Sequence, residues 1–134
     1  MIGGPEADSS ERGALDRRGT PAPTAATSDP SALEADLVRR AERVADRLAV
    51  VGPRLAGRES ASAATALDDI RQVTQNLADL GADAEGRARR PVPVLAAHAL
   101  GDQVRVLAHD VAATRDTAAL SEAVQLLRDL AARI

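Results

Sequence analysis

Two histidines, His98 and His109, are the only ones in this chain of 134 residues, and Asp102 and Arg105 lie between them. The four residues follow one another at spacings of four, three and four, so on a helix they share one face. Imidazole and carboxylate groups can transfer protons, bind metal ions or, for histidine, receive a phosphoryl group. This segment therefore carries the clearest chemical signal in the sequence.

The apolar residues of the same segment fall on nearly the opposite side of the helix. They are Leu100, Val104, Leu107 and Val111. The polar face is therefore expected to contact solvent or a partner rather than the interior. His98 and Asp102 alone provide too few ligands for a metal site. Because the chain also lacks cysteine and any Glu-x-x-His motif, we expect no bound metal ion.

An enzymatic activity is not expected either. The sequence contains no Gly-x-Ser-x-Gly motif for a nucleophile elbow and no glycine-rich loop of the kinds that hold nucleotides. A histidine on a solvent-facing helix surface lacks the burial that would adjust its pKa for acid–base catalysis. We therefore predict a chain without catalytic residues and without a cofactor.

The segment His98-Ala-Leu-Gly-Asp-Gln103 resembles the signature of histidine phosphotransfer domains. Those domains are four-helix bundles with a solvent-facing histidine in mid-helix, followed by x-Leu-Lys-Gly. His98 and Leu100 match this pattern, whereas Gly101 and Asp102 stand at the Lys and Gly positions. The resemblance implies His98 as a phosphoacceptor. Asp102 would repel a phosphoryl group one turn away, and Arg105 could offset this only in part.

Four segments with helical spacing of apolar residues must position these side chains. The spacing predicts helices over residues 31–55, 60–80, 93–113 and 117–134. No segment shows the alternation of a strand. Similar lengths and short connections favour an all-α fold, an antiparallel up-down four-helix bundle.

Helix starts and stops have recognisable signals. Ser31 with Glu34 forms a capping box for the first helix, and Asp116 or Thr117 can cap the fourth. The pair Gly52-Pro53 is expected to stop or kink the first helix, because proline lacks the backbone donor that a helix interior needs. Gly81 is expected to end the second helix.

Residues 1–29 differ in composition from the rest of the chain. Proline, glycine, serine and threonine alternate with charges there, and large apolar residues are almost absent. Burial could not offset the entropy of ordering such a segment. We predict a disordered tail over 1–29 and one bundle domain over 30–134.

The overall composition limits the classes of partner and the cellular location that can be expected. The chain has no aromatic residue and no cysteine, 30 alanines, and arginine at all 17 basic positions, a usage typical of a GC-rich bacterial genome. A net charge of −3 without aromatic stacking residues argues against nucleic-acid binding. No apolar run is long enough to span a membrane, and no secretory signal is evident, so a cytoplasmic protein is expected.

The fourth helix shows a broader apolar arc than the others. Leu126, Leu130 and Ile134 widen it to roughly 160° of the helical wheel. An arc of this width suggests a second contact surface outside the bundle. On this ground we predict binding of another protein through this helix, or a homodimer.

Arginines form a stripe along the first helix. They are Arg40, Arg43, Arg47 and Arg54. Their stems can cover the edge of a thin apolar core while their charged ends stay in water. The alternative is recognition of an acidic partner or an anion.

These features together predict a non-catalytic helical bundle that acts by protein–protein interaction or self-association, with no nucleic-acid or membrane partner. The candidate contact residues are those of the polar face and of the broad arc: His98, Asp102, Arg105, His109, Leu126, Leu130 and Ile134. A phosphotransfer-like module using His98 is the first alternative. A bundle that binds a small molecule is the second, since abundant alanine could leave an internal gap or could close the helices tightly.

Overall fold

A computed structural model describes residues 29–134, which form four α-helices and a short 3-10 helix. They are α3 (Pro30–Ala56), α4 (Ala61–Ala84), η2 (Ala97–Ala99), α5 (Leu100–Thr114) and α6 (Thr117–Arg133). The prediction of an all-α bundle with four helices is confirmed. The predicted tail lies outside the described residues except for Asp29, which precedes α3. Within the described part of the chain, no helix is long and apolar enough to cross a membrane.

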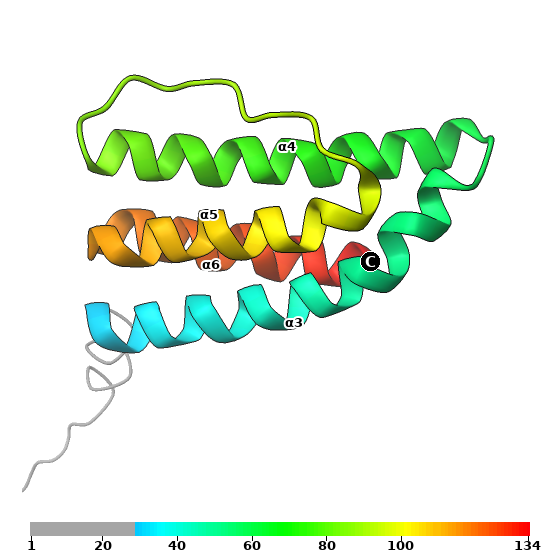
Figure 1. Ribbon diagram of the computed structural model, residues 1–134. Coiled ribbons are helices and arrows are strands. Elements are labelled where there is room, and N and C mark those ends of the chain that lie inside the picture. The colour runs from blue at the N-terminus through cyan, green and yellow to red at the C-terminus, as the bar shows by residue number, and fades with distance from the viewer. Residues whose placement is uncertain (1–28) are drawn as a thin grey trace, which may run out of the picture.

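The helices do not alternate in direction throughout (Figure 1). α3 and α4 run in opposite directions, as do α5 and α6. The segment 85–96, which we call the strap, returns along α4, so α4 and α5 run in the same direction. Twelve extended residues reach about 40 Å, and the 24 residues of α4 are about 36 Å long. The strap is therefore long enough to cross the whole bundle, where a short connection was expected.

Side-chain caps begin three of the helices. Asp29 accepts a hydrogen bond from the Ser31 amide, so it caps α3 in place of the predicted Ser31. Ser60 caps α4, and Asp116 caps α6 as predicted. Each cap supplies an acceptor for an amide that has no partner within the helix.

The expected start of the third helix at residue 93 is wrong, since α5 begins at Leu100. Residues 91–96 form no helix. Proline restrains its own φ and disfavours a helical conformation in the residue before it, and two prolines, Pro91 and Pro93, fall in this stretch. The Gln103 side chain donates a 3.0 Å hydrogen bond to the Pro93 carbonyl, which fixes the strap against α5.

One predicted helix end, at Gly81, and one predicted stop or kink, at Pro53, lie within continuous helix. α4 passes through Gly81, which is buried. A Cβ added there would lie 3.9 Å from a methyl group of Val111, an ordinary contact. α3 continues through Pro53 to Ala56 and bends in its last turns (Figure 1). The bend agrees with the expectation that Pro53 would stop or kink this helix.

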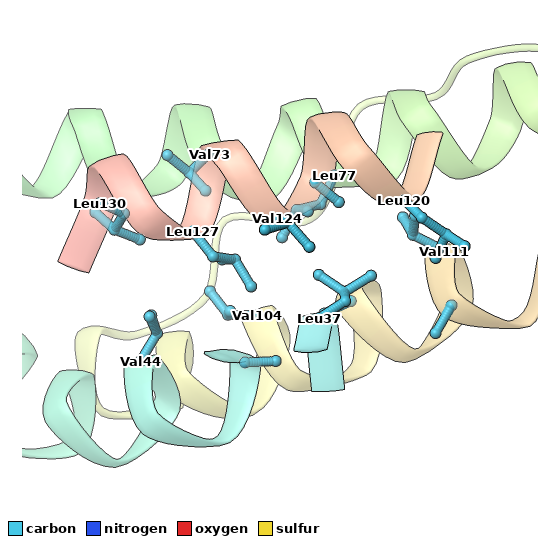
Figure 2. Packing of buried hydrophobic residues seen from close by; sticks show 14 of the residues in the cluster. Leu37, Val44, Val73, Leu77, Val104, Val111, Leu120, Val124, Leu127 and Leu130 are labelled. Carbon is cyan, nitrogen blue, oxygen red and sulfur yellow. The ribbon is translucent and has the colours of Figure 1, made fainter. Parts of the chain in front are cut away.

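The core lies between the four helices. Its largest fully buried side chains are all aliphatic except that of Thr74. Figure 2 shows leucines and valines from all four helices meeting along the bundle axis. Most of the leucines, isoleucines and valines that recur at helical spacing in the four segments are buried. They include Leu37, Val44, Leu48, Ile70, Val73, Leu77, Leu100, Val104, Val111, Leu120, Val124 and Leu127.

Glycine allows α3 to approach its neighbours closely. A Cβ added at Gly101 would lie 2.6 Å from the Ala45 carbonyl oxygen, and one added at Gly52 would lie 2.6 Å from the Ala97 carbonyl oxygen. No real Cβ atom tolerates such a distance without a backbone shift. The two glycines therefore hold η2 and the start of α5 against the C-terminal half of α3.

Candidate functional site

His98 lies in η2, before α5 begins, and its side chain is exposed. It is not in mid-helix, where a phosphotransfer histidine would be. Gly101, at the position of the signature lysine, is buried against the α3 backbone, so a lysine at that position could not reach a phosphoryl group. These two placements count against the phosphotransfer alternative.

Arg105 is the centre of an ion cluster between α5 and α3. Its Nε donates to both Glu42 carboxylate oxygens at 2.9 and 3.0 Å, and its Nη1 donates to Asp102 at 2.6 Å. Asp46 lies 3.7 Å from Nη2. The hydrogen bond to Glu42, aided by the charges of the nearby carboxylates, raises the pKa of Arg105 above its ordinary value.

His109 belongs to the same cluster, because its Nε2 lies 3.7 Å from a Glu42 oxygen. The structure thus brings Asp102, Arg105 and His109 together around a residue of α3, while His98 stands apart. No group of three or more potential ligands in residues 29–134 is arranged to hold a metal ion. Arg105 is held by carboxylates of both α3 and α5, which makes this face a bridge between two helices.

The broad arc of α6 faces the bundle rather than solvent. Leu130 is 1% exposed, so its prediction as a surface contact is wrong. Leu126 and Ile134 are partly buried and pack against the core. α6 contacts both α3 and α4, and an apolar strip that serves two neighbours must be wide.

A groove between α3 and α6 combines apolar and positively charged side chains. It encloses about 200 Å³ and is lined by Arg40, Arg43, Val44, Arg47, Leu127, Ala131 and Ile134. A shallower hollow continues it along α3 and is lined by Arg43, Asp46, Arg47, Val50, Val51 and Arg54. We call the two together the arginine groove.

The arginines of this groove differ in their pairing. Arg40 Nε lies 3.1 Å from the Asp36 carboxylate, and Arg47 donates a hydrogen bond to the Ile134 carbonyl oxygen. Among residues 29–134, no side-chain carboxylate lies within 4 Å of the guanidinium groups of Arg43 or Arg54, whereas Arg47 is already engaged by Ile134. The groove therefore carries positive charge that these residues do not neutralise.

The sequence indicated the arginine stripe of α3 but not the groove. The α6 residues of the groove lie more than 70 positions away from the stripe, and helical periodicity does not say which helices become neighbours. The sequence predicted Ile134 as a contact residue, but as part of the apolar arc of the fourth helix rather than of a groove with the first.

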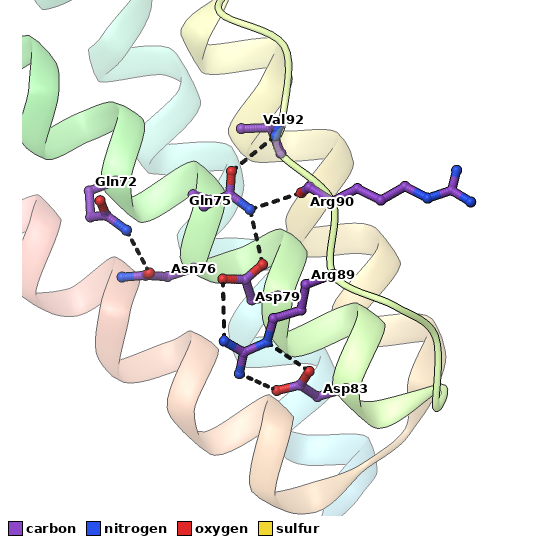
Figure 3. A network of polar contacts seen from close by, with 8 residues as sticks. All are labelled: Gln72, Gln75, Asn76, Asp79, Asp83, Arg89, Arg90 and Val92. Atoms are coloured by element: carbon purple, nitrogen blue, oxygen red, sulfur yellow. Dashed lines mark hydrogen bonds and ion pairs between the residues drawn. The ribbon is translucent and has the colours of Figure 1, made fainter.

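A second polar cluster joins the strap to α4 (Figure 3). Gln75 donates to the Arg90 carbonyl at 3.0 Å and accepts from the Val92 amide at 2.9 Å. Arg89 forms a two-bond contact with Asp83, at 3.0 and 2.7 Å. The Gln75 contacts supply hydrogen-bond partners to strap backbone groups that have none within a helix or strand.

No known protein family, curated protein or solved structure matches this chain. The arginine groove is the place where apolar surface and unneutralised charge coincide on the described residues. It is therefore the candidate functional site.

Proposed function

We propose that this chain is a non-catalytic protein-binding module whose contact surface is the arginine groove. The observation that carries the proposal is the pairing of apolar surface, from Ala131 and Ile134 above the core, with the unneutralised guanidinium groups around it. Arginine is enriched at protein interfaces, where its stem packs on apolar surface and its planar end binds carboxylates.

The groove is favoured over the polar face of α5 on grounds of charge. Arg105 is engaged by carboxylates on two helices, so a partner would have to displace contacts that already exist. Arg43 is exposed and has no such contact within the described residues. Binding there displaces water rather than an existing ion pair.

The size of the groove also bears on the alternative of a small-molecule site. Pockets for drug-sized ligands usually measure about 300–1,000 Å³ and enclose most of the ligand. The part between α3 and α6 is smaller, at about 200 Å³, and the extension, at about 520 Å³, is too open to enclose a ligand. A protein segment that lies along the surface fits this shape better.

Affinity capture from extracts of the source cells tests the proposal. The native chain, Arg43→Glu and Arg90→Glu are compared, because both variants reverse one exposed arginine, and the Arg90 side chain points away from its network (Figure 3). We expect a partner that is retained by the native chain and by Arg90→Glu and lost with Arg43→Glu. A partner retained equally by all three, or no partner at all, would overturn the proposal.

A further inference from the structure

We infer that the arginine groove receives an acidic amphipathic helix of a partner protein. This inference rests on the proposed function and names the chemistry of the bound segment. It follows from the spacing of the groove residues, from the depth of the apolar floor and from the distribution of charge.

The spacing along α3 is that of a helix–helix seam. Arg40, Arg43, Arg47, Val50 and Arg54 follow one another at intervals of three and four, with a repeat of seven. Residues with this repeat form a stripe that a second helix can follow along α3 up to the bend of its last turns. The stripe from Arg40 to Arg54 is about 21 Å long, so it matches about four turns of a partner helix.

The depth of the floor determines what can reach it. Val44 and Leu127 are buried core residues at the bottom of the groove, and Ala131 and Ile134 complete its α6 side. Val44 and Leu127 themselves are only 3% and 0% exposed, so the apolar side chains of a bound helix, one per turn, would contact Ala131, Ile134 and the arginine stems above them. Their contact would extend the core outward.

The positive charge of the groove favours acidic residues on both sides of the apolar face of the bound helix. The unneutralised guanidinium groups lie beside the apolar floor, so carboxylates next to the apolar stripe of the bound helix would meet them. Asp46 is the one acidic residue lining the groove. Its side chain is 81% exposed and lies 3.7 Å from Arg105, which draws it toward α5.

The same features disfavour a membrane or a nucleic acid at this site. The floor lies between two helices, whereas a membrane surface needs apolar residues that project, and only Val50 of the groove is a large apolar residue that is strongly exposed, at 52%. Nucleic-acid grooves commonly add aromatic stacking residues, and the chain has none. A protein helix can project apolar side chains into the groove and place carboxylates opposite its arginines.

Fluorescence anisotropy with a defined probe tests this inference. The probe is a fluorescein-labelled helical peptide of about 18 residues, enough to span the stripe, with leucines on one face and glutamates on both flanks. A scrambled peptide of the same composition spreads its leucines around the helix. Sedimentation with vesicles of a neutral and an anionic phospholipid measures the competing membrane reaction.

We expect the probe to bind the native chain and Arg90→Glu alike. Arg43→Glu should bind it about fivefold more weakly or worse, because one contact becomes a repulsion. The scrambled peptide should bind more weakly than the probe, and added salt should weaken both. Equal binding of the two peptides, equal binding by the two variants, or vesicle binding that Arg43→Glu removes would overturn the inference.

The two proposals fail in different ways. If capture recovers a partner that Arg43→Glu loses, while the probe does not bind, the groove binds protein but not an acidic helix. If capture also recovers nothing that depends on Arg43, the proposed function itself is wrong. Circular dichroism and thermal unfolding of both variants confirm that each one is folded.

Discussion

Gly101 shows how one residue fixes the contact between two helices. Replacement by alanine would put a Cβ 2.6 Å from the Ala45 carbonyl oxygen, so α5 would have to move away from α3. We expect Gly101→Ala to lower the free energy of unfolding by about 1–3 kcal/mol in urea denaturation.

Gly57 is the matched control for this change. It has a right-handed helical conformation, and an added Cβ would meet only ordinary contacts at 3.5 Å and beyond. Gly57→Ala should leave stability unchanged or raise it by up to about 1 kcal/mol. Equal losses in the two variants would contradict close helix packing at Gly101.

Arg89 controls the ionisation of Asp83. Its hydrogen bond lowers the pKa of Asp83 below the ordinary value. The bond thus stabilises the folded chain above the unfolded pKa, about pH 4, and this contribution is lost as the pH falls through the lower folded pKa. In carboxyl NMR titrations, we expect Arg89→Gln to raise the pKa of Asp83 and Arg90→Gln to leave it unchanged. A pKa unaffected by Arg89→Gln would show that the pair does not form.

Burial of single residues could be predicted well from the sequence, whereas their polar partners could not. The positions of Leu37, Val104 and Leu127 follow from helical periodicity alone. Arg105 was correctly placed on a polar face, but its partner Glu42 lies 63 residues away and depends on which helix packs beside α5. The error at Leu130 has the same origin, because a wide apolar arc fits either a partner or two neighbouring helices.

At the scale of elements, Gln75 holds the strap along α4. It satisfies the Arg90 carbonyl and the Val92 amide, neither of which lies in a helix or strand. We expect Gln75→Ala to speed hydrogen exchange at the Val92 amide and to cost about 1–2 kcal/mol of unfolding free energy.

Gln72 offers the control for the strap. Its side-chain amide donates to Asn76, one turn further along α4, so Gln72→Ala removes an amide from the same helix without touching the strap. Its effect on exchange at the Val92 amide should be negligible. Exchange at Val92 that is unchanged in Gln75→Ala would show that other contacts hold the strap.

Helix existence was predictable at this scale, but helix ends were less so. Ser60 and Asp116 cap helices where the sequence placed their starts, because their side chains act within one turn. The start of α5 was missed, because Gln103 and Arg71 of α4 hydrogen-bond the carbonyls of Pro93 and Leu95 and hold this part of the strap in a non-helical conformation. Such contacts join residues that are distant in the sequence and leave no periodic signal.

For the whole molecule, the direction of the helices decides which surfaces exist. The strap lets α5 start beside the C-terminal half of α3, and α6 then returns beside α3 as well. The arginine stripe of α3 thereby gains an apolar neighbour, which turns a solvated edge into a groove. The wide apolar arc of α6, which suggested a homodimer, packs against α3 and α4 within the bundle.

Isoleucine methyl NMR of the native chain, with the captured partner added, tests the central claim most directly. The chain has three isoleucines, of which Ile134 lines the groove and Ile70 is buried in the core, while Ile2 lies outside the described residues. The arginine groove as contact surface predicts a large shift of the Ile134 methyl signal, little change at Ile70, and loss of the Ile134 shift in Arg43→Glu. A partner that binds without moving the Ile134 signal would contradict it.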